Sequence, residues 1–158
     1  MALIPNDTEK RISVEFQKRV IELMDDAELK KKDLAVKANV SISVLSRILI
    51  YGIIPSLGVL IKLADTFNVS LKYLLAESEE TDFEKSEKNV TFQTRLQELI
   101  KENKTKYSVI AHSMPFTKNY FYEWEKSNTI PSWEYLKAIA DYFKVSPDYL
   151  LGRTDYKN

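Results

Sequence analysis

The side chains that could carry out catalysis are few and scattered. His112 is the only histidine, and the chain has no cysteine. A single imidazole without a second ligand or a nucleophile-elbow sequence makes neither a metal site nor a hydrolytic triad. Asp141 and Asp148 fall on different predicted helices and do not indicate an acid–base pair. We therefore expect His112 to be a half-exposed structural residue, and the protein to be no enzyme and to need no cofactor.

Three consecutive lysines, Lys30, Lys31 and Lys32, have side chains that bind phosphate well. They stand where a helix is predicted to begin, and cations there oppose the helix dipole unless an anion lies nearby. Asp33 offsets part of this charge, so a solvated charge run is the alternative interpretation. The placement favours contact with phosphate groups.

The elements that hold these residues are predicted to be helices only. The chain has three glycines and no alternating Val/Ile/Thr run, which argues against sheets. Apolar residues recur at helical spacing instead, as in Phe16, Val20 and Leu23. The predicted fold class is all-α.

Composition narrows the class of protein further. The 158 residues include 23 basic and 23 acidic side chains, so any argument for nucleic acid must be local. The longest apolar run, residues 48–55, is far shorter than the ~20 residues that span a bilayer, and the first residues lack the pattern of a signal peptide. The lack of cysteine fits a reducing compartment. We therefore expect a cytoplasmic protein with no membrane partner.

The chain contains an internal repeat. A shift of 76 positions aligns residues 16–76 with 92–152 without a gap, and the two copies end in FNVSLKYLL and FKVSPDYLL. Residues 77–91 between them hold six acidic residues and two lysines, which is typical of an exposed linker. The first copy has nine basic and six acidic residues, so the neutral whole conceals a mildly basic first domain.

We therefore predict a first domain with its N-terminal segment over residues 1–76, an acidic linker over 77–91, a second domain over 92–152 and a tail over 153–158. Five helices are expected in each domain, over 14–27, 31–38, 42–50, 56–68 and 70–76, and over 90–103, 107–114, 118–126, 132–144 and 146–152. The predicted N-caps of the third and fifth helices are Ser41, Thr117, Ser70 and Ser146.

This arrangement resembles the lambda-repressor-like helix-turn-helix family, also called the Cro/repressor or XRE type. The stretches that carry the resemblance are KKKDLAVKANVSISVLSRI in the first repeat and TKYSVIAHSMPFTKNYFYEWEKSNTIPSWEYLKAIADYFKVSPDYLLGRTD in the second. The resemblance implies two five-helix domains in tandem, each with a third helix that enters the major groove of DNA.

In the first repeat the resemblance places Ile42, Ser43 and Arg47 where the family reads bases. Arg47 would bind guanine, and Ile42 or Val44 would touch a thymine methyl group. Lys31 falls at the family's phosphate-binding position at the start of the second helix. The phosphate candidates of this repeat are Lys30, Lys31, Lys32, Ser41 and Val44.

In the second repeat the base-reading positions are taken by Lys118, Asn119 and Glu123. The corresponding phosphate candidates are Tyr107, Thr117 and Tyr120. This repeat departs from the family, because Glu123 and Glu125 put negative charge on the third helix and Pro115 replaces the usual turn glycine. Two interpretations follow: this repeat also reads DNA, or it is a packing or protein-binding domain.

The segment after the third helix of the first repeat is unusually apolar. Leu49, Ile50, Tyr51 and Ile53 have no obvious place inside so small a domain, whereas the matching stretch of the second repeat is polar. We predict that these four residues form an interface with repeat two or with a second protomer, whose twofold symmetry would set the spacing of two reading helices. The alternative is local packing under the fourth helix or against the N-terminal segment with Leu3 and Ile4.

These expectations indicate a sequence-specific transcription regulator of bacterial or phage type, most simply a repressor that occupies double-stranded DNA. It would act as a homodimer or as an intramolecular pseudo-dimer of its two repeats. The alternative is a protein-binding module, such as an antitoxin, a phage inhibitor or a regulator subunit, built on the same fold.

Overall fold

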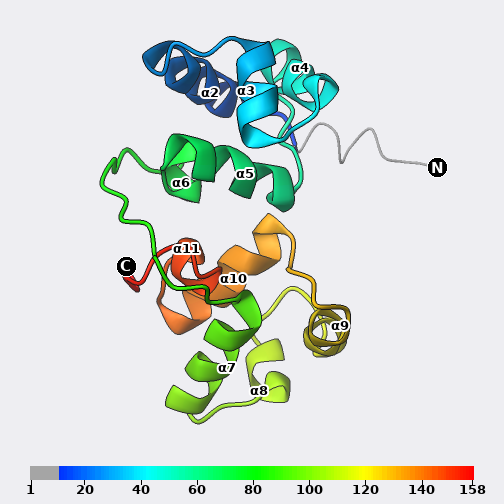
Figure 1. Ribbon diagram of the computed structural model, residues 1–158. Helices are drawn as coiled ribbons and strands as arrows, with labels where there is room; N and C mark the ends of the chain where they lie inside the picture. The colour runs from blue at the N-terminus through cyan, green and yellow to red at the C-terminus, as the bar shows by residue number, and fades with distance from the viewer. Residues whose placement is uncertain (1–10) are drawn as a thin grey trace, which may run out of the picture. The chain divides into compact units, whose positions relative to one another are not determined.

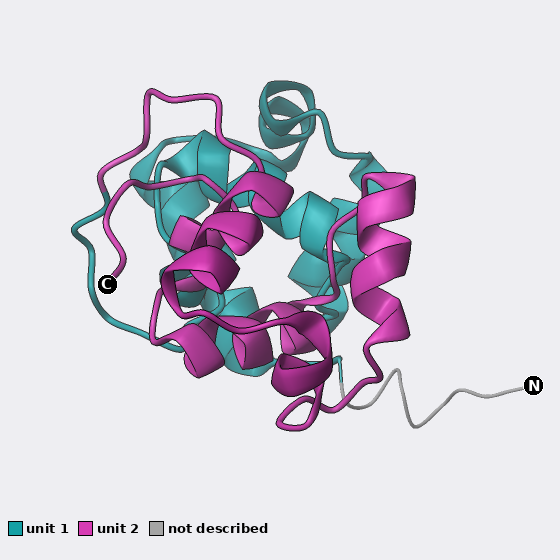
Figure 2. Ribbon diagram, turned by 90° about the horizontal axis from the view of Figure 1, so that it is seen from below, with its two compact units in different colours: residues 1–83 teal, residues 84–158 magenta. Residues whose placement is uncertain are grey.

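The computed structural model describes residues 11–158, whose regular structure is helical apart from one antiparallel bridge between Ile12 and Ile53 (Figure 1). The predicted all-α class is confirmed. The chain divides into two compact units, unit 1 (Met1–Phe83) and unit 2 (Glu84–Asn158), which Figure 2 colours separately. Of the helices in residues 11–158, none has the length and apolar character that a membrane span requires. Leu3 and Ile4 lie outside the described residues.

Unit 1 contains α2 (Val14–Asp26), α3 (Lys31–Ala38), α4 (Ile42–Tyr51), α5 (Leu57–Phe67) and α6 (Leu71–Leu74). Serine side chains begin three of these helices, because the hydroxyls of Ser13, Ser41 and Ser70 each accept a backbone N–H three residues on. Each helix contributes at least one fully buried side chain to the core, as the following show: Phe16, Leu34, Leu45, Leu60 and Leu71.

Unit 2 contains α7 (Phe92–Glu102), α8 (Tyr107–Ala111), α9 (Asn119–Ser127), α10 (Trp133–Phe143) and α11 (Pro147–Leu150). Thr91 and Ser146 cap α7 and α11 with their hydroxyls. The core of this unit is rich in aromatic rings, with Phe121 fully buried and in edge contact with Trp124 at 5.5 Å and with Phe116 at 5.3 Å. The expected N-cap Thr117 is wrong, because α9 begins at Asn119 and its N-cap is Lys118.

A buried arginine ties the first helix of each unit to the end of that unit. In unit 1 the guanidinium of Arg19 lies 3.9 Å from the ring centroid of Tyr73 and donates to the carbonyl of Ser78 and to the carboxylate of Glu79. It also donates to the carbonyl of Tyr73. A planar guanidinium can make all these contacts at once, since it has five N–H donors and a face that stacks on aromatic rings.

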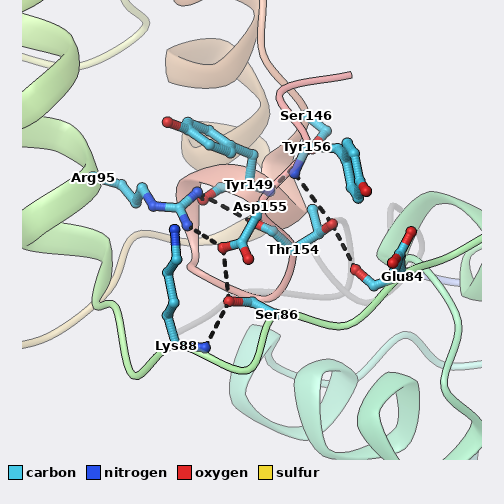
Figure 3. A network of polar contacts seen from close by, with 9 residues as sticks. All are labelled: Glu84, Ser86, Lys88, Arg95, Ser146, Tyr149, Thr154, Asp155 and Tyr156. Atoms are coloured by element: carbon cyan, nitrogen blue, oxygen red, sulfur yellow. Dashed lines mark hydrogen bonds and ion pairs between the residues drawn. The ribbon is translucent and has the colours of Figure 1, made fainter.

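Unit 2 makes the same set of contacts 76 positions later. Arg95 lies 4.0 Å from the ring centroid of Tyr149 and donates to the carbonyls of Tyr149 and Thr154 and to the carboxylate of Asp155, as Figure 3 shows. Ser86 donates to the same carboxylate at 2.7 Å. We call each set, Arg19 with residues 73–79 and Arg95 with residues 149–155, an arginine latch.

The arginine latches explain why the unit boundaries differ from the predicted segments. Residues 77–91 are not a free linker, because Ser78 and Glu79 complete the latch of unit 1 and the buried Ser86 belongs to unit 2. The predicted tail also begins inside the fold, since Arg153 and Thr154 are buried. Arg153 pairs with the buried Asp148. The charged composition of both segments is typical of solvent-exposed chain and gives no sign of these specific hydrogen-bond partners.

Candidate nucleic-acid interface

Unit 1 contains two helices joined by a short turn, α3 and α4. The turn depends on Asn39, which has a left-handed backbone with a φ of +56° that ends α3. The next residue, Val40, is buried and donates its N–H to the carbonyl of Ala35, so the turn is anchored to both the core and the helix. Ser41 then caps α4, accepting the N–H of Val44 at 3.2 Å. These contacts fix the direction in which α4 leaves the turn.

The predicted base-reading residues of unit 1 lie on the outer side of α4. Leu45 and Ile48 are fully buried and anchor the inner side of the helix. Ile42, Ser43 and Arg47 are exposed, and Ile42 leaves 47% of its surface in water. All three predicted side chains are therefore available on the surface of α4.

The lysine run lies beside this surface. Asp33 accepts the backbone N–H of Lys30 at 3.1 Å, so one carboxylate satisfies an N-terminal donor of α3 and offsets the cationic charge. Lys31 donates from its Nζ to the hydroxyl of Ser46 at 3.1 Å, which holds the ammonium of α3 against α4. Lys30, Lys31 and Lys32 are all exposed. Sequence reasoning named the lysines but missed Ser46, which only the packing of α3 on α4 makes visible.

Two further phosphate candidates of unit 1 are less available. The hydroxyl of Ser41 is engaged as the cap of α4 and lies 3.3 Å from the hydroxyl of Ser43. The backbone N–H of Val44 donates to the hydroxyl of Ser41, and the residue is half-buried. Since an aliphatic side chain has no donor, Val44 has no free group with which to bind a phosphate oxygen.

The corresponding turn of unit 2 has a different geometry. Pro115 takes the place of Asn39, and its ring fixes φ near −65°, so the left-handed conformation that ends α3 is impossible there. The helix α8 accordingly ends at Ala111, shorter than the predicted 107–114, and His112 is its exposed C-cap.

A further difference between the two units is seen at Gln93, on the first helix of unit 2. The equivalent Gln17 donates to the carbonyl of Leu49 at 2.8 Å, whereas the buried amide atoms of Gln93 meet no partner among residues 11–158.

Tyr107, the predicted phosphate contact of unit 2, is engaged inside the unit. Its ring stacks on Phe121 with centroids 4.6 Å apart and meets Tyr122 edge-on at 5.1 Å. Its hydroxyl accepts from Gln97 at 2.7 Å and donates to Glu125 at 3.3 Å. Burial raises the pKa of Tyr107, and the nearby carboxylate of Glu125 raises it further. The single hydroxyl proton of Tyr107 is therefore donated to Glu125 within unit 2.

The other predicted residues of unit 2 are on its surface. Lys118, Asn119, Glu123 and Thr117 are exposed. Tyr120 is partly exposed and packs its ring against Phe116 and Tyr135, with centroids 5.6 and 5.4 Å apart. The outer side of α9 thus carries bulky aromatic rings and a carboxylate where α4 carries small or aliphatic side chains and an arginine.

The predicted interface residues separate into two groups. Ile53 is half-buried in its bridge with Ile12, beside Gly52, whose carbonyl accepts the N–H of Ser13 at 2.8 Å. Leu49 is also half-buried. Ile50 and Tyr51, by contrast, leave 62% and 63% of their surfaces in water. The N-terminal segment thus holds the loop through residues 11–13, while Ile50 and Tyr51 remain as an exposed apolar pair.

Residues 11–158 contain no cluster of three or more histidine or acidic side chains placed to hold a metal ion.

Comparison with known proteins gives one match. Residues 20–74 match the family model described as helix-turn-helix, a stretch that runs from within α2 to the end of α6. The matched residues of unit 1 are therefore similar to the helix-turn-helix class. Searches of the curated proteins and of the solved structures found no match.

Proposed function

We propose that this protein is a sequence-specific DNA-binding transcription regulator of bacterial or phage type that reads the major groove with α4. The observation that carries the proposal is the combined surface of α3 and α4 within the helix-turn-helix match. Ile42, Ser43 and Arg47 face outward on α4, and the lysine run of α3 lies beside them. Side chains on a groove-entering helix read base edges, while neighbouring cations bind phosphate.

The regulator acts as a repressor in this proposal. Occupying duplex DNA excludes polymerase by its bulk, so the protein needs no catalysis and no cofactor, and it works in the cytoplasm where its DNA lies. The chain is a tandem pair of five-helix domains. The arginine latches support this, because Arg19 and Arg95 make matching contacts at a spacing of 76 residues.

The proposed regulator also pairs with a second copy through Ile50 and Tyr51. Both are apolar and exposed at the end of α4, whereas the matching residues of unit 2 are Lys126 and Ser127. An apolar pair of this kind is more favourable when covered, and a twofold axis beside it would hold two copies of α4 at a fixed spacing. A single chain could space its two units in a similar way as an intramolecular pseudo-dimer.

Selection of DNA fragments by the full chain tests the function. Fragments from a genomic library or a random pool are bound, recovered and sequenced, and the enriched duplex is titrated at several salt concentrations. We expect one enriched motif and a log–log salt slope of about −3 for each copy of unit 1 on the duplex, since three lysine–phosphate contacts each contribute about −0.9. A flat salt response, or no enrichment at low salt, would refute the proposal.

A second candidate function applies to unit 2. The hydrogen bond from Tyr107 to Glu125 uses the only donor at the family's phosphate position, and Pro115 alters the turn. These features favour a protein-binding role for this unit, as in an antitoxin, a phage inhibitor or a regulator subunit. The double variant Lys118→Ala with Asn119→Ala distinguishes the two roles. Unchanged DNA affinity and an unchanged enriched motif would support the protein-binding role, while loss of part of the motif would show that α9 reads bases.

A further inference from the structure

The chain enters the two units along different paths. In unit 1 the entering segment passes the loop after α4, where the N–H of Ser13 donates to the carbonyl of Gly52 at 2.8 Å. Residues 84–90 enter unit 2 and run beside its C-terminal end instead, where the N–H of Ser86 donates to the carbonyl of Arg153 at 2.8 Å. We call residues 84–90 the strap.

Two glycines, one in each unit, account for this difference. A Cβ atom on Gly52 would lie 2.9 Å from a backbone oxygen of the segment that enters unit 1, and unit 2 has Asn128 at the matching position. A Cβ atom on Gly152 would lie only 2.0 Å from the carbonyl oxygen of Val90, and unit 1 has Ala76 there. Each path therefore needs a glycine that the other unit lacks.

Hydrogen bonds rather than apolar packing hold the strap on unit 2. The hydroxyl of Ser86 donates to the carboxylate of Asp155 at 2.7 Å, and the hydroxyl of Thr154 donates to the carbonyl of Glu84 at 2.7 Å (Figure 3). Val90 is the only large apolar side chain in the strap. A segment that buries so little apolar surface opens at a lower free energy than the core beneath it.

We propose that the strap detaches from unit 2 while the helices stay folded, and that it thereby sets the length of the chain that joins the two units. The arginine latch of unit 1 ends at Glu79. With the strap attached, the chain from Glu79 to Glu84 spans at most about 17 Å when fully extended. With the strap detached, the chain from Glu79 to Thr91, the cap of α7, spans at most about 41 Å.

The length of this connection determines which DNA sites one chain spans, a consequence that rests on the proposed DNA-binding function. The gain of about 24 Å corresponds to about seven base pairs, since base pairs are stacked about 3.4 Å apart. A pseudo-dimer with the strap attached therefore favours closely spaced half-sites. Widely spaced half-sites select the detached state, and their affinity is reduced by the free energy that detachment costs.

Distance measurements on the full chain test the strap without DNA. The chain has no cysteine, so Lys18→Cys in α2 and Lys101→Cys in α7 give one exposed spin-label site in each unit. Double electron–electron resonance then measures the distribution of distances between the two labels. Gly152→Ala releases the strap, because the new Cβ atom meets the strap backbone. The matched control is Gly58→Ala, whose Cβ atom would make only an ordinary van der Waals contact.

We expect the distance distribution of Gly152→Ala to extend beyond that of the wild type, by up to about 24 Å, and that of Gly58→Ala to stay unchanged. Gly152 has a φ of +79°, so alanine also strains the backbone there. Ser86→Ala with Thr154→Val is therefore a second releasing variant, and tryptophan fluorescence checks the fold of unit 2 in both. An unchanged distribution in every variant that stays folded overturns the proposal. Unfolding of unit 2 in both variants overturns it too, since the strap would then be an integral part of the unit.

Duplexes in which the two half-sites of the selected site are moved apart test the consequence for DNA, at concentrations where the chain sediments as a monomer. At wide spacing, Ser86→Ala with Thr154→Val should bind about fivefold or more tightly than the wild type, the equivalent of one hydrogen bond, and at the closest spacing equally well. Equal affinities at every spacing would overturn the role of the strap in DNA spacing and leave the proposed function standing. A lack of specific binding overturns the proposed function, whereas detachment of the strap is decided by the distance distributions alone.

Discussion

At the scale of single residues, Arg47 and Lys31 differ in what they can distinguish. The guanidinium of Arg47 has a fixed fork that matches two acceptors on guanine, whereas the ammonium of Lys31 is a point charge held beside Ser46. We expect Arg47→Ala to cost about 1–3 kcal/mol and to relax the preference at one base pair. Lys31→Ala should weaken binding to all sequences alike and make the salt slope about one unit shallower.

Titration of each variant against the selected duplex and against duplexes with single base changes measures both effects. Glu123→Ala in unit 2 is the control for charge changes on a third helix. If Arg47→Ala kept the full base preference while Glu123→Ala lost it, α9 rather than α4 would be the reading helix.

The carboxylate of Asp155 gives the fold a dependence on pH. The hydrogen bond from Ser86, with further effects of Lys88 and Arg95, lowers the pKa of Asp155 below its ordinary value (Figure 3). A lowered pKa stabilises the folded state above the ordinary aspartate pKa of about 3.9, and this stabilisation is lost as the pH falls through the lower folded value. We therefore expect Asp155→Asn to unfold at lower urea concentration than the wild type at pH 7, with the difference reduced at pH 3.

Tryptophan fluorescence measures this effect in one unit, because both tryptophans, Trp124 and Trp133, lie in unit 2. Asp141→Asn is the matched control, since Asp141 is exposed and outside the arginine latch. An equal difference between Asp155→Asn and the wild type at both pH values would contradict the assigned role of the carboxylate.

At the scale of elements, the turn between α3 and α4 depends on one backbone conformation. Asn39 has a φ of +56°, which asparagine and glycine tolerate and proline cannot adopt. We expect Asn39→Pro to destabilise unit 1 by about 3 kcal/mol or more and to abolish specific DNA binding. Asn39→Gly should keep both properties. Thermal unfolding followed by circular dichroism, together with titration of the selected duplex, measures the two outcomes. Retained binding by Asn39→Pro would show that the position of α4 does not depend on this turn.

The elements that the sequence predicted well are those whose ends have local signals. The third and fourth helices of the first repeat are predicted over 42–50 and 56–68 and are Ile42–Tyr51 and Leu57–Phe67. The cap Ser41 marks the start of the third helix, and apolar spacing marks both helices. The outward placement of Arg47 on α4 follows from the same spacing. The end of α8 was predicted less well. The apolar spacing extends to residue 114, but the helix ends at Ala111, ahead of Pro115, whose ring cannot continue a helix.

The contacts that sequence reasoning missed join residues far apart in the chain. Arg95 and Asp155 are 60 positions apart, and nothing near either residue marks them as partners. The charged composition around Ser86 therefore predicted an exposed linker. The hydrogen bond from Lys31 to Ser46 joins residues that are closer in the sequence, but it also depends on how α3 and α4 pack against each other. Such contacts become visible only when packing is known.

At the scale of the whole molecule, the proposed dimer concerns how two reading helices are spaced. Ile50 and Tyr51 are the exposed apolar pair at the end of α4, and covering a large apolar side chain fully contributes about 1.5–3 kcal/mol. Ile53 is a poor position for a test, because its bridge with Ile12 stabilises unit 1 itself. The double variant Ile50→Lys with Tyr51→Lys gives the pair the cationic character of Lys126 in unit 2 without disturbing that bridge.

We expect the wild type to sediment as a dimer at micromolar concentration and the double variant to sediment as a monomer with a lower melting temperature, because association of folded chains stabilises the folded state. The variant should also bind the selected duplex more weakly, because a monomer loses the second half-site contact that a dimer makes at high effective concentration. The matched control is Ile42→Lys, which adds charge to an exposed isoleucine of the same helix and should leave the mass unchanged. A wild-type chain that is monomeric over this range, or a double variant that remains dimeric, would rule out this surface as the dimer contact. A monomeric wild type that still protects two half-sites would indicate the intramolecular pseudo-dimer, in which the two units of one chain take the two places on the DNA.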